Sequence, residues 1–229
     1  MNQLKVCLSI AGLDPSGGAG AIADVKTFSA FGCFATAAIT SLTFQNTVQV
    51  LGATHQSAET VRGQVEPILE DFEISAVKTG MLPTAEIIEE TADLIRVRGL
   101  KNIVVDPVVR STSGFDLIDN AALKTLVKML FPLANLITPN IPEAERISGI
   151  AIADESDIEA AARQMQSMGA RNVLIKGGHA PTADLKQQGS RKAKDHLFSG
   201  DDVHIFEADY IESSSTHGTG CTLSAAIAA

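Results

Sequence analysis

The chain has 229 residues, of which 45% are hydrophobic and 20% are charged, as in an ordinary folded globular protein. Lys and Arg number 18 and Asp and Glu number 27, which gives a formal charge of −9. This acidic balance argues against a general nucleic-acid-binding protein, although it leaves room for a local phosphate site. The sequence has no apolar run long enough for a membrane helix and no signal-peptide pattern, and its three cysteines form no CxxC pair. We therefore expect a cytoplasmic protein with no nucleic-acid partner and no membrane contact.

Strand-like and helical patterns alternate along the whole chain. In the first half of the chain we expect a strand at 4–10, a glycine-rich loop at 12–20, a helix at 21–31, strands at 34–42 and 48–54, and a helix at 57–72. There follow a strand at 76–79, a helix from Thr84 to Gly99, a strand at 102–105 and a helix after Asp119. The last expected elements are a strand at 135–138, a helix from Ser156, a strand at 173–176 and a hairpin from 196–198 and 203–206. This alternation predicts an α/β fold of three αβα layers, with a mostly parallel sheet covered by helices on both faces. No linker divides the chain, so we expect a single domain over residues 1–229.

Capping residues mark several of the expected helix ends. Thr84 and Asp119 are N-cap residues, and Gly99 ends the helix that Thr84 begins. Ser156 and Glu159 have the spacing of a capping box. These local signals predict where three of the helices begin.

Two segments carry conflicting signals. Pro67 lies inside the helical pattern 57–72 and is expected to kink or divide that helix. Residues 183–194 are rich in lysine and arginine and have low complexity. We expect a solvated loop there, with a mobile cover over a phosphate site as the alternative.

Glycine-rich and polar residues follow several expected strands, at the edge where an open α/β sheet binds its ligands. Residues 18–23 match a loose dinucleotide fingerprint, but the first glycine follows the strand too late and no acidic residue lies at the ribose position. A Walker A motif is absent, because neither Lys26 nor Lys176 has the required neighbours. An NAD-binding protein and a P-loop ATPase are therefore disfavoured.

Residues 216–222, Thr-His-Gly-Thr-Gly-Cys-Thr, carry the stronger signal. Two glycines just before a helix of small residues leave backbone N–H groups open, and the helix dipole adds positive potential there. Such a turn can stabilise the charge on a transferring phosphoryl group. The plain alternative is a glycine-rich turn that only starts a helix.

The motif resembles that of the hydroxymethylpyrimidine/phosphomethylpyrimidine kinases, which belong to the ribokinase-like superfamily and act in thiamine biosynthesis. Further matching segments occur in family order, at residues 9–20, 23–28, 43–47, 78–81, 106–108 and 138–145. Most sugar kinases of the superfamily carry Asp where this chain has Cys221, so the pyrimidine branch is favoured. That branch also resembles pyridoxal kinases, so the substrate is less firmly indicated than the reaction.

The resemblance implies a site for each part of the reaction. It implies a pyrimidine pocket from Gly12, Asp24, Gln45, Met81 and Val108. A Gln side chain both donates and accepts, and an Asp accepts from an exocyclic amine, which suits an aminopyrimidine. The two apolar residues would cover the ring faces, unless they are ordinary core residues.

For the phosphoryl group, the resemblance implies ATP and Mg²⁺ as cofactors. It implies that Cys221 is the base and that it lies in an anion hole formed by Gly218, Thr219 and Gly220. It further implies nucleotide contacts from Lys176, Asn140 and Thr219. The implied Mg²⁺ ligands are Asp106 and Glu143. Asn140 and Glu143 also have the spacing of a capping pair, and both roles can hold together. A thiol at a helix N-terminus is expected to have a lowered pKa.

The chain departs from the family pattern at two places. Thr112 stands where family members often have Lys, and the chain ends eight residues after Cys221, so we expect that it lacks the last helices of the family fold. The interpretation is a kinase for 4-amino-5-hydroxymethyl-2-methylpyrimidine and its monophosphate. A pyridoxal kinase and a non-catalytic pyrimidine-binding protein are the alternatives, and a homodimer is one open option for its assembly.

Overall fold

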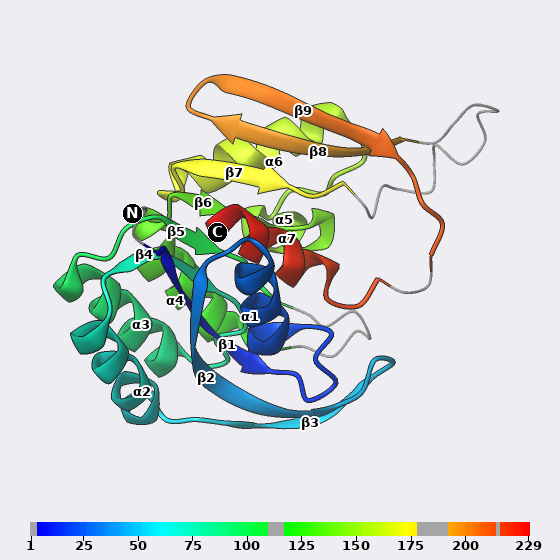
Figure 1. The fold of residues 1–229 in the computed structure, drawn as a ribbon. Coiled ribbons are helices and arrows are strands. Elements are labelled where there is room, and N and C mark those ends of the chain that lie inside the picture. Colours follow the sequence, from blue (N-terminus) through cyan, green and yellow to red (C-terminus); the bar gives the residue numbers. More distant parts are fainter. Residues whose placement is uncertain (1–3, 110–116, 178–191, 214–215) are drawn as a thin grey trace.

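The computed structural model describes residues 4–109, 117–177, 192–213 and 216–229 (Figure 1). In this part of the chain, strands form one sheet in the order β3-β2-β1-β4-β5-β6-β7-β8-β9. Their bounds are β1 (Val6–Leu13), β2 (Phe34–Gln45), β3 (Val50–His55), β4 (Ile74–Thr79), β5 (Ile103–Val105), β6 (Leu136–Ile137), β7 (Asn172–Ile175), β8 (Lys192–Ser199) and β9 (Asp202–Asp209). The six central strands β2, β1, β4, β5, β6 and β7 are parallel to one another. At the two edges, β3, β8 and β9 pair antiparallel with their neighbours.

The helices form a layer on each side of this sheet. Their bounds are α1 (Gly20–Ala30), α2 (Ala58–Asp71), α3 (Ala85–Arg98), α4 (Asn120–Leu130), α5 (Ile141–Ser148), α6 (Glu155–Ser167) and α7 (Thr219–Ala228), with a short 3-10 turn at Phe131–Leu133. Helices α1 and α7 lie against each other in front of the sheet, although they come from opposite ends of the chain (Figure 1). Helices α2, α3 and α4 pack in succession on the other face, and α5 packs against α6.

Alternation along the strands sends side chains to two separate cores. Leu8 and Val77 join the large core, which includes side chains of the helices from α2 to α6. Their neighbours Cys7 and Ala76 join a small core with Phe28 of α1 and residues of α7. Successive residues of a strand point to opposite faces, so a fully buried strand must be apolar on both sides.

Local capping signals are confirmed at Thr84 and Asp119, whose side chains accept from the N–H groups of Ile87 and Ala122. Gly99 ends α3 in the left-handed conformation, with φ of 62°. The expected helix start at Ser156 is wrong. The N-cap is Asp154, because its carboxylate accepts from two first-turn N–H groups and Asp157 completes the capping box.

Pro67 does not divide the helix in which it lies, because α2 is continuous from Ala58 to Asp71. Val61 and Val65 are fully buried on its inner face, so tertiary packing holds the helix together at the position where Pro67 lacks an N–H. Of the segment expected as a loop at 183–194, residues 192–194 belong to β8. The rest of that segment and Thr112 lie outside the described residues.

Candidate active site

A cavity of about 1040 Å³ opens at the edge of the sheet where the parallel strands end. The segments that follow β1, β4, β5, β6 and β7 line it, together with the first turn of α7. Its lining includes twelve of the thirteen residues selected from the sequence, namely Gly12, Gln45, Met81, Asp106, Val108, Asn140, Glu143, Lys176, Gly218, Thr219, Gly220 and Cys221. The tertiary structure therefore brings residues from both ends of the chain into one site.

Asp24 is the residue that the cavity does not include. Its side chain is fully buried on α1, and both carboxylate oxygens accept from Lys78 Nζ at 2.9 Å. Ser9 Oγ donates to the same carboxylate at 2.6 Å. A contact of Asp24 with the substrate stays a prediction, but Asp24 lies outside the cavity lining and its carboxylate already accepts from Lys78 and Ser9.

Lys78 is a component of the site to which the sequence analysis gave no role. It is the last residue but one of β4, which ends at Thr79. Lys78 has no exposed surface, and it lines the cavity. Burial lowers the pKa of Lys78, but the charges of Asp24 and Asp106 and the hydrogen bond to Asp24 outweigh this effect and raise it. A single charged residue inside the short strand expected at 76–79 was the available signal.

Asp106 and Lys176 form a second buried ion pair, at the ends of β5 and β7. Lys176 Nζ donates to Asp106 Oδ1 at 3.1 Å, and Thr138 Oγ1 donates to the same oxygen at 3.1 Å. Ser224 Oγ of α7 donates to Oδ2 at 3.2 Å. Burial raises the pKa of Asp106, but Lys176 and Lys78 outweigh it, so that the pKa lies below its ordinary value. The carboxylate is therefore ionised and anchored from three elements.

Glu143 is a further acidic residue of the cavity lining, and it is part of the helix cap of α5. Its Oε2 accepts from Asn140 N at 2.9 Å, while Asn140 Oδ1 accepts from Glu143 N at 2.9 Å, so the expected capping pair is present. Val109 N donates to Oε1 at 3.4 Å. Burial raises the pKa of Glu143 to about 7; Lys176 opposes this shift and Asp106 adds to it.

The two carboxylates suit Mg²⁺, which is held in proteins by one or two carboxylates and completes its shell with water and substrate phosphates. Among the described residues, no group of three or more His, Cys, Asp or Glu side chains could by itself hold a metal ion. A metal ion at Asp106 and Glu143 would thus depend on further ligands from the nucleotide. It would also favour the ionised form of Glu143.

The first turn of α7 faces this charged group. Gly218 is the N-cap, with φ of 77° and no side-chain cap. A Cβ at Gly220 would lie 3.1 Å from Lys176 Nζ and 4.0 Å from Asp106 Oδ2, so the glycine lets the ion pair approach the helix backbone. N–H groups at a helix N-terminus beside a lysine form a phosphate-binding geometry, although Thr219 N here donates to the Thr216 carbonyl at 3.4 Å.

Cys221 lies in the same turn, and its thiol differs from expectation. Burial raises the pKa of Cys221, and the charges of Asp106 and Asp24 raise it further. Lys78 and the N–H of Gly20 act in the opposite direction without reversing the shift. The expected lowering is therefore corrected: position at a helix N-terminus is outweighed by loss of water and by nearby carboxylates.

The other end of the cavity is more apolar. Met81 is 8% exposed, and its Sδ lies 3.1 Å from the position that a Cβ at Gly12 would occupy. Thr40 Oγ1 fixes the Met81 backbone by donating to its carbonyl at 2.6 Å. Val108 and Gln45 complete this end. Gly12 thus lets the Met81 side chain pack directly against the backbone at the end of β1.

Asp14 and His217 are also absent from the residues selected from the sequence. Their side chains lie 2.7 Å apart, from Oδ2 to Nε2, although 203 positions separate them in the chain. Both residues occur within segments that carried the family resemblance. A periodicity argument could not find this pair, because the contact depends on the packing of α7 against the loop after β1.

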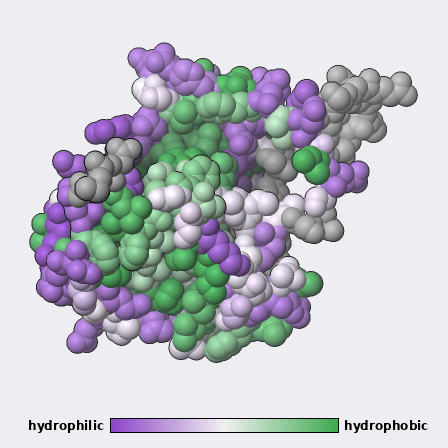
Figure 2. Space-filling view, viewed as in Figure 1, coloured by the Kyte–Doolittle hydropathy of each residue, from purple (hydrophilic) through white to green (hydrophobic). Residues whose placement is uncertain are grey.

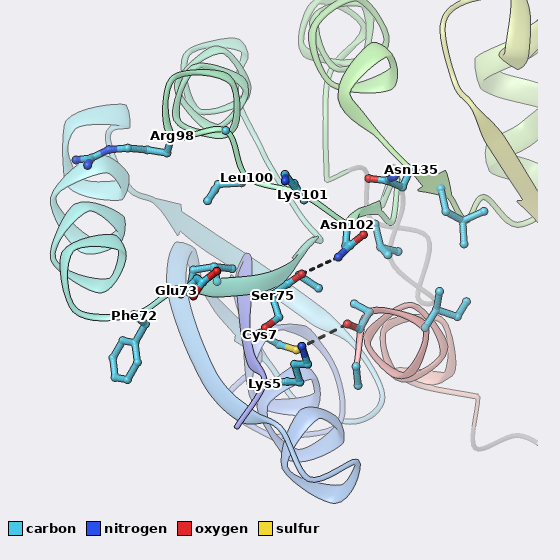
Figure 3. Close-up of a pocket in the computed structure, with 18 of the residues that line it drawn as sticks. Lys5, Cys7, Phe72, Glu73, Ser75, Arg98, Leu100, Lys101, Asn102 and Asn135 are labelled. Carbon is cyan, nitrogen blue, oxygen red and sulfur yellow. Dashed lines mark hydrogen bonds between the residues drawn. The ribbon is translucent and has the colours of Figure 1, made fainter. Parts of the chain in front are cut away.

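A second hollow, of about 1100 Å³, lies at the opposite edge of the sheet (Figure 3). Figure 3 shows Cys7 directed toward the end of α7, where its thiol donates to the Ala228 carbonyl, and Asn102 bonded to the Ser75 carbonyl. Hydrophobic residues gather on the surface between α7 and strands β7 and β8 (Figure 2). The lining of this hollow includes none of the thirteen residues, so we place the site at the other edge.

A sequence model described as "Phosphomethylpyrimidine kinase" matches residues 14–229. The chain belongs to this family. The hydroxymethylpyrimidine/phosphomethylpyrimidine kinase of Haemophilus influenzae is 43% identical over 230 residues, which span 100% of this chain and 84% of that protein. The family, the three-layer αβα fold and the identification as a phosphotransferase are thereby confirmed.

Two solved structures show the same architecture. The phosphomethylpyrimidine kinase of Clostridium difficile 630 matches with a TM-score of 0.81 and 39% identity, over 98% of this chain and 89% of that one. The pyridoxal kinase of Bacillus subtilis in complex with ADP matches with a TM-score of 0.85 and 35% identity, over 99% and 83%. In the described part of this kinase, no helix has the length and apolar character needed to cross a membrane.

Proposed function

We propose that this kinase transfers the γ-phosphoryl group of ATP to the hydroxymethyl oxygen of 4-amino-5-hydroxymethyl-2-methylpyrimidine, and then phosphorylates the resulting monophosphate. The observation that supports this most is the cavity itself. Its apolar end, with Gly12, Met81 and Gln45, faces the same space as its charged end at Lys176. A single cavity can thus hold an aromatic substrate beside a polyphosphate.

At the apolar end, we propose that Met81 and Val108 cover the faces of the pyrimidine ring while Gln45 bonds to its edge. Gly12 lets the Met81 side chain lie close against the backbone of this wall, which would set the position of one ring face. Asp24 supports the site from behind by holding the Lys78 ammonium. Its role is therefore to maintain charge in the cavity wall.

At the charged end, Lys176, Asn140 and Thr219 would bind the nucleotide phosphates, and the backbone of Gly218, Thr219 and Gly220 would stabilise the transferring group. Asp106 and Glu143 would hold Mg²⁺, which neutralises phosphate charge. Phosphoryl transfer depends mainly on such positioning and charge stabilisation. The ion pair of Lys176 with Asp106 shows that both groups reach the same point.

Cys221 would accept the proton of the substrate hydroxyl. The substrate oxygen then forms a bond to the γ-phosphorus, the bond from that phosphorus to the bridging oxygen breaks, and ADP leaves. Cys221 must be a thiolate to accept the proton, and the groups that favour this form are Lys78 and the Gly20 N–H. The pKa of the thiol stays raised even with both groups present, so forming the thiolate adds to the cost of this step.

ADP release tests the proposal, measured in parallel with the hydroxymethyl pyrimidine, its monophosphate and pyridoxal. Release with either pyrimidine but not with pyridoxal supports it. The likeness to the Bacillus subtilis pyridoxal kinase makes a pyridoxal kinase the second candidate, and release with pyridoxal alone would transfer the assignment to it. Pyrimidine binding without any ADP release would instead identify a binding protein.

We further propose that residues 1–229 act as one kinase domain in the cytoplasm, and that two copies associate. All three cysteines are free thiols, as a reducing compartment requires. Exposed apolar side chains on the β2–β3 hairpin, including Phe44, Val48 and Leu51, offer a surface for a second copy. Light scattering after size exclusion would give a monomer mass if the association does not occur.

A further inference from the structure

Asp14 is a buried carboxylate at the end of β1 that has several donors. Its side chain accepts from Ser16 N at 2.8 Å, from Ser16 Oγ at 2.9 Å and from Ala19 N at 2.9 Å. These bonds fold the glycine-rich loop, residues 12–20, around the carboxylate. The fourth partner is His217 Nε2 at 2.7 Å, which comes from the other end of the chain.

The backbones of the two segments meet directly beside this pair. Gly218 has φ of 77°, and a Cβ there would lie 1.8 Å from the Gly18 carbonyl oxygen. A Cβ at Gly18 would lie 2.6 Å from His217 Cδ2. Two glycines therefore allow the close approach, and the Asp14–His217 bond holds it.

This contact lies at the base of the proposed anion-binding turn. His217 is followed at once by Gly218, Thr219 and Gly220, whose backbone faces Lys176 and Asp106. Gln45, the proposed contact to the pyrimidine edge, lies near the Asp14 side chain and helps to lower the pKa of its carboxyl. One carboxylate thus touches both the substrate end and the phosphoryl end of the cavity.

The charge of Asp14 suits this role. Burial raises the pKa of Asp14, but hydrogen bonds from His217, Ser16 and Gln45 outweigh it and lower the pKa to about 2. The carboxylate remains an acceptor throughout the working range of an enzyme. Bonds to an ionised acceptor are stronger than neutral ones, so the two segments are held more firmly.

We propose that Asp14 and His217 are positioning residues that fix the anion-binding turn of α7 against the glycine-rich loop and keep it in register with Gln45. The proposal rests on the proposed function of the site. Neither side chain transfers a proton or binds the phosphoryl group. Their effect is on the place of the backbone amides, where a displacement of about 1 Å can cost about 10²-fold in rate.

The test compares His217→Phe, which keeps a planar ring but no donor, with His217→Gln, which keeps a donor. The exposed His204 supplies the matched control, His204→Phe. We expect His217→Phe to lower kcat by about 10²-fold, with a change of no more than about threefold in the pyrimidine KM. His217→Gln should recover a large part of kcat.

A second measurement does not need activity. Hydrogen exchange of the amides in 216–222 and 14–20 should accelerate in His217→Phe but not in His204→Phe or His217→Gln. Unchanged exchange in His217→Phe would overturn the proposal, as would equal loss of kcat in the Phe and Gln variants. If the wild type phosphorylates no pyrimidine and no pyridoxal, the proposed function fails, and the exchange result still decides whether the pair holds the turn.

Discussion

Lys78 has no exposed side-chain surface, and its ammonium contacts both oxygens of an equally buried carboxylate. Removing either partner leaves a charge that water cannot reach. Removing both avoids that penalty. The pair is therefore a sensitive point for stability as well as for the charge in the cavity.

Lys78→Met is expected to lower the free energy of unfolding by about 3–5 kcal/mol, because the buried Asp24 then keeps only the Ser9 hydroxyl and has no counter-charge. Asp24→Leu should have a cost in the same range. The double variant should be more stable than the sum of the two single losses predicts, as measured by urea unfolding with unchanged m-value. Additive losses would show that the two groups do not act as a pair.

Cys221 shows how strongly its surroundings act on one residue. At the N-terminus of a helix a thiol usually gains acidity, but here burial and two carboxylates raise its pKa. At neutral pH the group is therefore a thiol in the free enzyme. Its reactivity should report this directly.

In a variant with Cys7 and Cys33 replaced by Ser, alkylation of Cys221 by iodoacetamide should be slower at pH 7 than that of a free cysteine, whose pKa is about 8.5. The alkylation rate should still rise above pH 9.

Cys221→Ala should lower kcat by about 10²–10⁴-fold if the thiol is the base. A near-wild-type kcat across pH would leave the backbone of the turn as the catalytic part of the motif.

At the scale of elements, α5 combines a capping box with a site carboxylate. The side chain of Glu143 both caps the helix and lines the cavity. Its raised pKa follows from burial, so the protonated form is favoured in the folded state up to about pH 7. One residue thus links the stability of a helix to the chemistry of the site.

The sign of the pH effect follows from this shift. Between the ordinary value of 4.5 and about 7, the unfolded chain loses the Glu143 proton first, so ionisation favours unfolding. We expect the stability of the wild type relative to Glu143→Gln to fall as pH rises across this window. Urea unfolding of both proteins at several pH values measures it, and a constant difference between them would contradict the prediction.

The two helix layers of the molecule bury different numbers of apolar side chains against the sheet. Among the described residues, the core behind α1 and α7 has six buried apolar side chains, of which Phe28 is the largest, whereas the other core contains most of the buried apolar side chains. The layer with less buried apolar surface carries the anion-binding turn. Segments with few buried contacts open at lower free energy than the rest of a protein.

Phe28→Ala should therefore loosen α1 and α7 selectively. We expect faster hydrogen exchange in these two helices with little change in α3, and a global loss of about 3–5 kcal/mol at most. Phe131→Ala, an equally buried phenylalanine of the large core, is the control. It should destabilise the fold without selective exchange in α7; equal patterns for both variants would show that the layers open together.

Much of the fold and the place of the site followed from local patterns. Strand–helix alternation predicted the three layers, and the rule that ligands bind where parallel strands end predicted the edge at which Asp106, Asn140 and Lys176 meet. Helix starts were predicted correctly at Thr84 and Asp119, because a cap depends on residues only three positions apart. At Asp154 the same reasoning chose the wrong residue, since neighbouring polar residues compete for one helix end.

The sequence by itself determined the elements, their order and the family, since these depend on periodicity, caps and motifs that are read locally. Only the tertiary structure decided that Asp24 belongs to Lys78, 54 positions away, and that Asp14 meets His217. It also decided the protonation of Cys221 and Glu143. Burial and the nearest charges control these properties, and both arise from residues that come together only when the sheet and its two helix layers have packed.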